Sequence, residues 1–334
     1  MISLAHYLGG LFLGWSLGTN DSANVFGTAV SSRMVGYRTA VVLAALFVVL
    51  GAILQGEAGI HTLSQDLRRD TGAAADLLSE SDLRLQRERA RTRAIVVSYA
   101  AAGTVTFMSL LKMPVSASQA VVGAIVGADL LRGQVDYGGL GKVVACWLGT
   151  PVGGIFFTFL FYYAFRSLLR RWSPSLFTYD PTITVLLIVS GCYGAYALGA
   201  NNVASVSAVF VGDGMLTTRQ AAAYGGLAIA FGILTYSKPV MMTIGTGIVP
   251  LDSFTAFVVV LAHAVTVHIY ALIGVPVSTS QAVVGSLIGI GIIKGAHTIN
   301  YQRLGGVIMA WMAAPLIAAF MAWTALFVVR MLRG

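Results

Sequence analysis

Charged side chains are scarce in this sequence: Asp, Glu, Lys and Arg make up 10% of its 334 residues, whereas 57% are hydrophobic. A soluble domain carries about 25% charged residues, so the composition excludes that class. Several apolar runs approach or exceed the ~20 residues that cross a bilayer as a helix, namely 39–56, 94–111, 143–165, 182–200, 253–277 and 304–329. They lack the alternation of barrel strands. The sequence therefore predicts an all-α polytopic protein of the cell membrane.

Cysteine is also rare. Cys146 and Cys192 lie in different apolar runs, so neither a disulfide framework nor a metal site is indicated. The N-terminus lacks the Lys/Arg cluster of a cleavable signal, and its apolar stretch runs directly into a polar motif at 18–21. We expect that stretch to be the first membrane segment.

The combinations of residues that catalysis requires are missing as well. A phosphate-hydrolysing enzyme would be expected to show an activated nucleophile, metal ligands or a phosphate loop, and the sequence contains none of these motifs. We therefore expect neither an enzyme nor a bound cofactor. The net charge of +8 is spread among short loops, which cytoplasmic enrichment of Lys and Arg explains without a nucleic-acid partner.

What the sequence does contain is a duplication. Residues 114–123 read PVSASQAVVG, and residues 276–285 read PVSTSQAVVG, at an offset of 162. Residues 18–24 (GTNDSAN) correspond to 199–205 (GANNVAS) at an offset of 181. Duplicated halves in a helical membrane protein are typical of secondary transporters, whose substrate sites lie at the repeat interface in interrupted helices.

The change of offset shows that the first half carries extra residues between its two motifs. Segment 64–93 is strongly charged, with seven Arg and six Asp or Glu, and we interpret it as an extramembrane helix or loop that starts near 79–82. The predicted domains are a first transmembrane repeat at 1–63 and 94–172, this insertion at 64–93, and a second repeat at 181–334.

The two Pro-Val-Ser segments have the chemistry of an anion site. Proline suits the first turn of a helix, where unpaired N–H groups and a partial positive charge attract anions. Two such termini meeting across a pseudo-two-fold axis would surround one anion with donors. Packing between helices is the alternative role for Ser and Thr. The predicted substrate-binding residues are Ser116, Ser118, Gln119, Ser278, Thr279, Ser280 and Gln281.

The Asp/Asn motifs have the chemistry of a cation site. Asp21 would be costly in a bilayer and is a functional candidate for that reason. If this segment is helical, Asn24 shares a face with Asp21, and their oxygens suit a hard cation such as Na⁺. The predicted cation-binding residues are Asp21, Asn24, Asn20, Asn201, Asn202 and Ser205, with Na⁺ possible at Asp21, Asn24 and Asn202. Alternatively, Asn20 and Asn201 hold the ends of a broken backbone together.

An anion site beside a cation site is what uptake of a dianion needs. Moving one charge across ~100 mV involves about 2.3 kcal/mol, so a dianion entering a negative cell interior faces about twice that. Two monovalent cations moving with it cancel the penalty. We therefore expect a cation-coupled symporter of a small tetrahedral oxyanion.

Residues 18–24 with Phe26-Gly27-Thr28, together with Pro-Val-Ser-x-Ser-Gln in both halves, resemble the inorganic phosphate transporter (PiT) family. The resemblance covers nearly the whole chain. It implies two inverted repeats of about ten to twelve segments with interrupted helices, a homodimer, and cation-coupled uptake of phosphate. It also implies that the anion lies among the Ser/Thr groups and Na⁺ near the Asp/Asn motifs.

The chain departs from the usual family pattern. Asn202 and Ser205 stand where the family has Asp and Asn, and Gln119 and Gln281 stand where it has His. Phosphate carries hydrogens that need an acceptor, whereas sulfate carries none, so a site of donors only suits sulfate. Sulfate permeases also occur in the family. Phosphate is the first expectation and sulfate the alternative. Na⁺ and H⁺ both remain open, and an ion channel is a further class.

Membrane sidedness is not fixed by the charges. Arg166, Arg170 and Arg171 end one apolar segment, and Arg330 and Arg333 end its counterpart in the second half. Inverted repeats would put these ends on opposite sides of the membrane, in conflict with the rule that basic residues face the cytoplasm.

Overall fold

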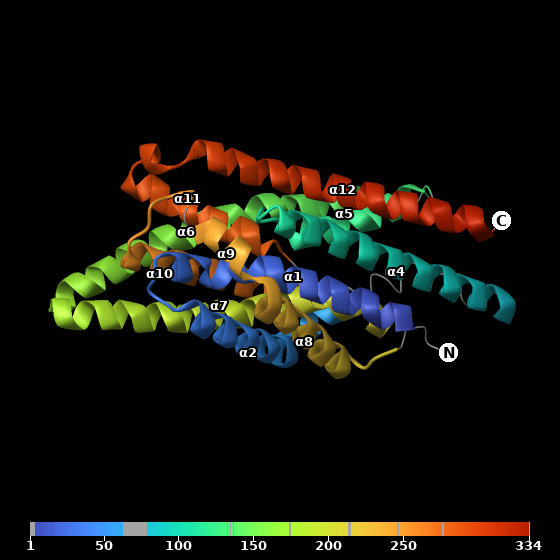
Figure 1. Cartoon of the computed structure of the whole chain (residues 1–334), viewed down its shortest axis with the longest axis horizontal. Coiled ribbons are helices and arrows are strands. Elements are labelled where there is room, and N and C mark those ends of the chain that lie inside the picture. Colours follow the sequence, from blue (N-terminus) through green and yellow to red (C-terminus); the bar gives the residue numbers. More distant parts are fainter. Residues whose placement is uncertain are drawn as a thin grey trace.

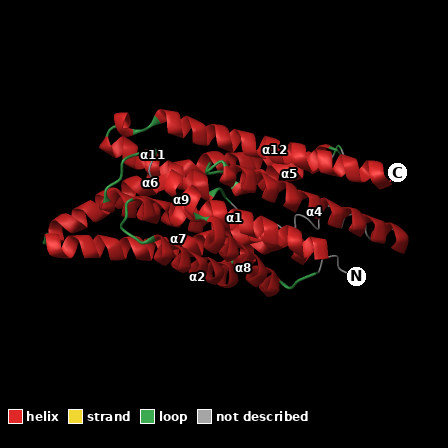
Figure 2. Ribbon diagram, viewed as in Figure 1, coloured by secondary structure: helices red, strands yellow, loops and turns green. Residues whose placement is uncertain are grey.

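The computed structural model describes residues 4–333 apart from 63–78, 132, 134, 136, 174, 213–214, 246 and 276, and all regular structure in this part of the chain is helical (Figure 2). The helices, drawn in Figure 1, are α1 (Leu4–Ser31), α2 (Tyr37–Gln55), α4 (Glu80–Leu110), α5 (Ala117–Leu130), α6 (Tyr137–Trp172), α7 (Leu176–Gly212), α8 (Thr218–Tyr236), α9 (Lys238–Gly245), α10 (Ser253–Ile273), α11 (Thr279–Lys294), the 3₁₀ turn η2 (Ala296–Thr298) and α12 (Tyr301–Arg333).

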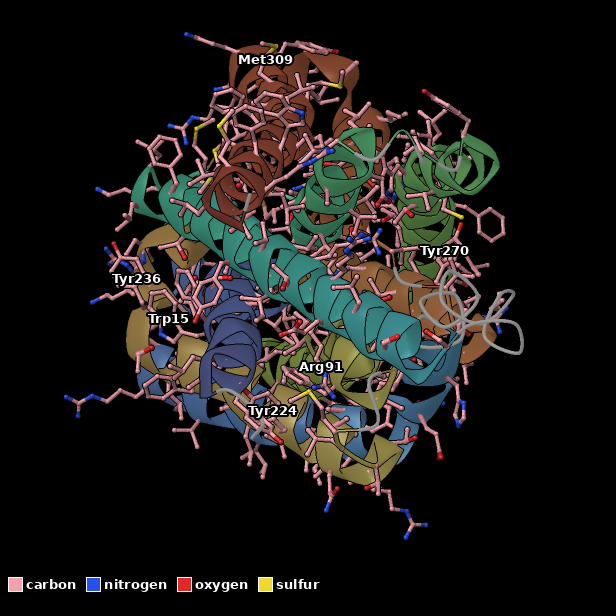
Figure 3. The ribbon with its side chains drawn as sticks, turned by 90° about the vertical axis from the view of Figure 1, so that its right-hand side faces the viewer. Trp15, Arg91, Tyr224, Tyr236, Tyr270 and Met309 are labelled. Carbon is pink, nitrogen blue, oxygen red and sulfur yellow. The ribbon has the colours of Figure 1, made fainter. Side chains whose placement is uncertain are left out.

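Helices long and apolar enough to cross a membrane are found in α2, α4, α6, α7, α10 and α12. Their apolar windows cover the runs identified from the sequence, so the prediction of an all-α polytopic membrane protein is confirmed. Viewed along the long axis, Met309 points outward from α12 (Figure 3), and it is 67% exposed. Such exposed apolar residues suit a lipid environment.

Two pairs of helices form hairpins that double back within the protein. α4 ends at Leu110 and α5 returns from residue 117, and Arg93 in the middle of α4 pairs with Asp129 near the end of α5 at 2.7 Å. α10 ends at the left-handed Gly274 (φ 76°) and α11 returns from Thr279. The two Pro-Val-Ser segments therefore lie at hairpin tips. The Asp/Asn motifs at 18–24 and 199–205, which were also expected to interrupt helices, lie instead inside the continuous helices α1 and α7, so that part of the prediction is wrong.

The second hairpin is also closed at its base by an ion pair. Lys294, the last residue of α11, lies 2.6 Å from Asp252, the residue that caps the start of α10. Partial burial alone would raise the pKa of Asp252. Hydrogen bonds from Lys294 and Thr255 outweigh that effect, and the pKa lies below its ordinary value. The carboxylate therefore stays ionised and paired at neutral pH.

The two halves pack against each other by equivalent contacts. α1 packs on α8 and α2 on α7, while α5 packs on α12 and α11 on α6. A Cβ built on Gly123 of α5 would lie 2.2 Å from the carbonyl oxygen of Pro315, and one built on Gly285 of α11 would lie 2.2 Å from that of Pro151. Both glycines allow a backbone approach that any side chain would block. The helices of each half therefore pack mainly against helices of the other half.

The equivalent halves run in opposite directions. In Figure 1, α6 ends at the turn into α7 at the left of the molecule, whereas its counterpart α12 ends at the right. The arginines at the ends of these two helices consequently lie at opposite ends of the protein, as inverted repeats require.

The charged insertion is described only in part. α4 begins at Glu80 and continues without a break into the apolar segment after residue 93, so residues 80–93 extend a membrane helix. The remainder, 63–78, lies outside the described residues. The domain boundaries at 64–93 and 181–334 stay a prediction.

The close contact at Gly285 gives a test of the packing of α11 against α6. We expect Gly285→Ala to lower the free energy of unfolding by about 1–3 kcal/mol, because overpacking at this site must displace the backbone of α6. Gly306→Ala is the control, since a Cβ there meets nothing within 4 Å. Thermal unfolding of both variants in detergent checks this, and equal melting temperatures would contradict the packing.

Candidate substrate and ion site

The tip of the first hairpin is held by Asn20 of α1. Its Nδ2 donates to the carbonyl of Met113 at 3.2 Å, and its Oδ1 accepts from the backbone N–H of Val115 at 3.0 Å. The same Nδ2 donates to Ser109 Oγ at 3.0 Å. One buried carboxamide thereby satisfies the backbone groups that the broken helix leaves unpaired.

Asn201 of α7 does the same for the second hairpin. Its Nδ2 donates to the carbonyl of Val277 at 2.9 Å, and the N–H of Val277 donates to its Oδ1 at 3.0 Å. Both ends of each carboxamide are thus used by the backbone, which supports the alternative raised from the sequence for Asn20 and Asn201. Cation binding by these two residues stays a prediction.

The residues next to these anchors join the two halves. Asn202 Nδ2 donates to Asp21 Oδ2 at 2.6 Å, and Asn202 Oδ1 accepts from Asn201 Nδ2 at 2.8 Å. Asp21 and Asn202 are equivalent positions at the offset of 181, so their hydrogen bond marks the pseudo-two-fold axis. Hydrogen bonds and adjacent residues therefore connect one hairpin tip to the other through the centre of the protein.

Asn24 connects α1 to the start of α11. Its Nδ2 donates to Thr279 Oγ1 at 3.0 Å and lies 3.5 Å from Asp21 Oδ1, while its Oδ1 is buried without a partner. The equivalent positions in the other half are Ser205 and Ala117. Ala117 has no hydroxyl, so the pair formed by Asn24 and Thr279 exists on one side of the axis only.

Both short helices begin at the centre with the same capping geometry. Ser116 Oγ accepts from the N–H of Gln119 at 3.3 Å at the start of α5, and Ser278 Oγ accepts from the N–H of Gln281 at 3.2 Å at the start of α11. A second serine lies 3.1 Å from each capping hydroxyl, namely Ser118 and Ser280. Each helix start therefore carries the same serine cap and the same partial positive charge.

Two acceptor oxygens at these helix starts are unpartnered. Gln119 Oε1 and Gln281 Oε1 are buried and make no hydrogen bond. Buried polar atoms are nearly always satisfied, so an exception in equivalent places requires an explanation. The sequence suggested a cradle of donors only. The structure adds an unused acceptor at each helix start.

Asp21 is the charge at the centre of the site. The residue is 1% exposed, and within the described ranges neither ion pair includes it. Its Oδ1, the free Oδ1 of Asn24 and the hydroxyl of Thr279 form a set of oxygens of the kind that a hard monovalent cation accepts. Burying an unneutralised carboxylate is strongly unfavourable, so the site favours a bound cation or a proton.

The described geometry agrees with comparisons to known proteins. The family model for the phosphate transporter family matches residues 17–322. The chain belongs to the phosphate transporter family. It is therefore an integral, multi-pass membrane protein of a transporter family, and membership argues against an enzyme.

Individual relatives extend over most of this transporter. It is 25% identical to a protein of Methanocaldococcus jannaschii described as a candidate phosphate permease, over 92% of this chain and 91% of that protein. It is 26% identical to the sulfate permease CysP of Bacillus subtilis, over 95% of this chain and 85% of the relative. A solved structure named as the sodium-dependent phosphate transporter superposes with a TM-score of 0.80 at 19% identity, covering 98% of each chain. That likeness confirms the fold.

Sequence reasoning did not find Ser109. This buried residue accepts from Asn20 and so supports the first tip. It lies in an apolar run, and its counterpart at the offset of 162 is Ala271. Neither a motif nor a repeat could have singled it out, because its role depends only on the packing of α4 against α1.

The anchoring role of Asn201 gives a stability prediction. We expect Asn201→Ala to lower the free energy of unfolding by about 1–3 kcal/mol, because it leaves the buried N–H of Val277 without an acceptor. Ser205→Ala, one turn further along α7, should have little effect. Thermal unfolding checks both variants. An Asn201→Ala protein as stable as the wild type would show that the tip does not depend on this side chain.

Proposed function

We propose that this protein is a secondary transporter that moves a small tetrahedral oxyanion, with inorganic phosphate as the first candidate, together with a monovalent cation. The observation that carries the proposal is the buried Asp21, which lies without a described cationic partner beside the starts of two helices. A carboxylate alone would repel an anion. A cation bound at Asp21 turns the same site into one that attracts it, so binding of the two ions is mutually favourable.

The starts of α5 and α11 supply the donors for the anion. Each follows a hairpin tip that Asn20 or Asn201 holds in place, and each begins with a serine cap. Free N–H groups at such helix starts are what transporters use for anionic groups. Hydroxyl, carboxamide and backbone donors would surround the oxyanion from both sides of the axis. The proposed ligands are Ser116, Ser118, Gln119, Ser278, Thr279, Ser280 and Gln281.

The coupling ion is assigned to Asp21, Asn24 and Thr279, with Asn202 orienting the carboxylate from the other half. Na⁺ is the first candidate because the unpartnered oxygens are hard ligands, and the similar solved structure is named as sodium-dependent. H⁺ is the alternative, since a proton on Asp21 would also remove the buried charge. The equivalent residues Asn202, Ser205 and Ala117 have no carboxylate, so we assign one such cation site.

Phosphate is favoured over sulfate by Gln119 and Gln281. Their buried, unpartnered Oε1 atoms can accept the hydrogens that hydrogen phosphate carries and sulfate lacks. An unsatisfied buried acceptor costs about 1–3 kcal/mol, which would weaken sulfate binding relative to phosphate. Sulfate remains the second candidate because CysP, a sulfate permease, is a relative.

A homodimer is also proposed, on the resemblance to the family. The exposed apolar faces of α6 and α12, which include Val152, Phe156, Leu316 and Phe320, are available to a second copy or to lipid.

Uptake by proteoliposomes tests the function directly. We expect saturable uptake of labelled phosphate that requires an inward Na⁺ or H⁺ gradient, with sulfate a weaker competitor. Each gradient is imposed separately so that the coupling ion is identified. Non-saturable flux that persists without a cation gradient would indicate a channel, and absence of phosphate and sulfate flux under every gradient would reject the proposal.

The role of Asp21 is tested in the same assay. Asp21→Asn preserves the shape of the side chain but removes the charge that holds the cation, so we expect cation stimulation of uptake to fall by roughly tenfold or more, the factor that 1.4 kcal/mol represents. Asp180→Asn, at an exposed carboxylate of α7, is the matched control. Undiminished stimulation in Asp21→Asn would remove Asp21 from the cation site.

A further inference from the structure

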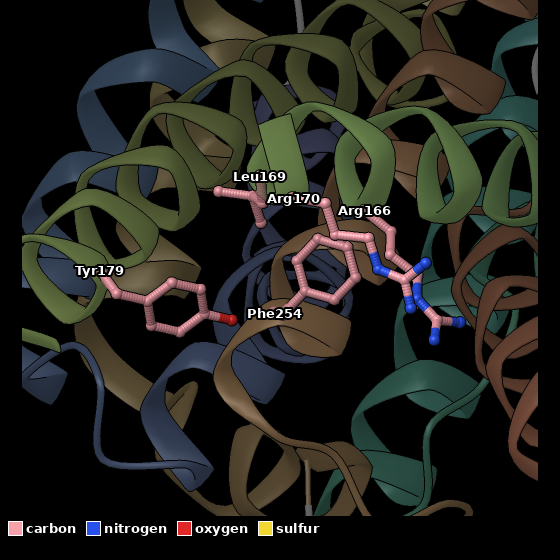
Figure 4. Close-up of a pocket in the computed structure, with 5 residues that line it drawn as sticks. All are labelled: Arg166, Leu169, Arg170, Tyr179 and Phe254. Atoms are coloured by element: carbon pink, nitrogen blue, oxygen red, sulfur yellow. The ribbon is translucent and has the colours of Figure 1, made fainter. Parts of the chain in front are cut away.

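A pocket lies far from the central site, where α6 ends, α7 begins and α10 begins. It has a volume of about 270 Å³ and is lined by Arg166, Leu169, Arg170, Tyr179 and Phe254 (Figure 4). Figure 4 shows the guanidinium groups of Arg166 and Arg170 extending from the same side of α6, with the rings of Phe254 and Tyr179 beneath the helix. The transport mechanism proposed above does not use these residues.

The two arginines of this pocket have no described ion-pair partner, and the nearby carboxylates are Asp180 and Asp252, whose charges act on Tyr179. Arg166 lies over the ring of Tyr162, 5.7 Å from its centroid, and its Nη1 is 3.5 Å from the Tyr162 hydroxyl. The described ion pairs include neither Arg166 nor Arg170. The carboxylate that caps α10, Asp252, is already paired with Lys294 at 2.6 Å. Two guanidinium groups one helical turn apart therefore have donors available for an external anion.

The surroundings of the pocket are those of a membrane boundary. Arg166 and Arg170 lie in the last part of the apolar span 143–172. Exposed aromatic side chains gather at this end, and such residues favour the level of the lipid headgroups. They are Tyr163 (55% exposed), Trp172 (54%) and Phe177 (91%). Leu160 and Phe156, earlier in the same apolar span of α6, are exposed apolar side chains.

We propose that this pocket binds the phosphate group of an anionic phospholipid, whose acyl chains lie along the exposed face of α6. Two arginines can clamp phosphate oxygens with parallel hydrogen bonds, and basic pockets between membrane helices are suited to lipid headgroups. The adjoining apolar face selects a lipid over a free phosphate ion, because a free ion would gain nothing from Leu160 or Phe156. The proposed lipid site is independent of the transported substrate.

Lipid binding to the purified full chain tests the proposal. The protein is placed in phosphatidylcholine nanodiscs with increasing phosphatidylglycerol, and the melting temperature is followed. We expect a saturable rise for the wild type. In Arg166→Gln/Arg170→Gln the apparent affinity should be roughly 30-fold weaker, at about 1 kcal/mol for each arginine. Arg330→Gln, at the equivalent end of α12, is the matched control and should respond like the wild type.

A phosphatidylglycerol response that is the same in the double variant and the wild type overturns the proposal. Inorganic phosphate is titrated into phosphatidylcholine nanodiscs as a further arm. A rise of the melting temperature there that depends on Arg166 and Arg170 would make the pocket a free-oxyanion site and would also overturn it. Should the double variant fail to fold, Arg170→Gln alone decides, because that side chain makes no described hydrogen bond or ion pair within the protein.

Discussion

The structure depends on one hydrogen bond between equivalent positions, in which Asn202 donates to the Asp21 carboxylate at 2.6 Å. A carboxylate in a membrane interior is tolerated only where its charge is compensated, and this hydrogen bond stabilises part of that charge. On either side of it, Asn20 and Asn201 fasten the two hairpin tips. The four residues thus fix both helix starts relative to a common axis. The proposed transport mechanism needs this arrangement because the anion and the coupling cation would both be held by parts that belong to different halves.

The symmetry of the scaffold and the asymmetry of its chemistry have different physical origins. The close approach of Gly123 to Pro315 is repeated by Gly285 and Pro151. At this backbone distance only glycine fits, so both halves have glycine at the contact. The proposed ion site has no such restriction. On one side Asn24 meets Thr279, whereas the counterparts are Ser205 and Ala117. Both residues of the Asn24–Thr279 pair are replaced in the other half, as expected if the two side chains act together.

Much of the candidate site could be located because it lies in repeated motifs. The offsets of 162 and 181 identified the two Pro-Val-Ser segments and both Asp/Asn segments, and the apolar runs predicted the spans. That the Pro-Val-Ser segments are hairpin tips came from the structure. Other features had no signature in the sequence. Ser109 supports the first hairpin tip only because α4 packs on α1. The ion pairs Arg93–Asp129 and Lys294–Asp252 each join the two helices of a hairpin. Hydropathy alone could not distinguish such a hairpin from a helix that crosses the whole membrane.

The sequence by itself determined that the protein is helical, lies in the membrane, consists of two related halves and concentrates its polar residues at two pairs of motifs. These properties follow from composition and periodicity, which are local. The tertiary structure decided which motif residues anchor the backbone and which do not. Asn20 and Asn201 have both ends of their carboxamides occupied, while Asn24, Gln119 and Gln281 keep unpartnered oxygens. Residue type cannot reveal that difference, because a hydrogen-bond partner contributed by another helix exists only once the chain has folded.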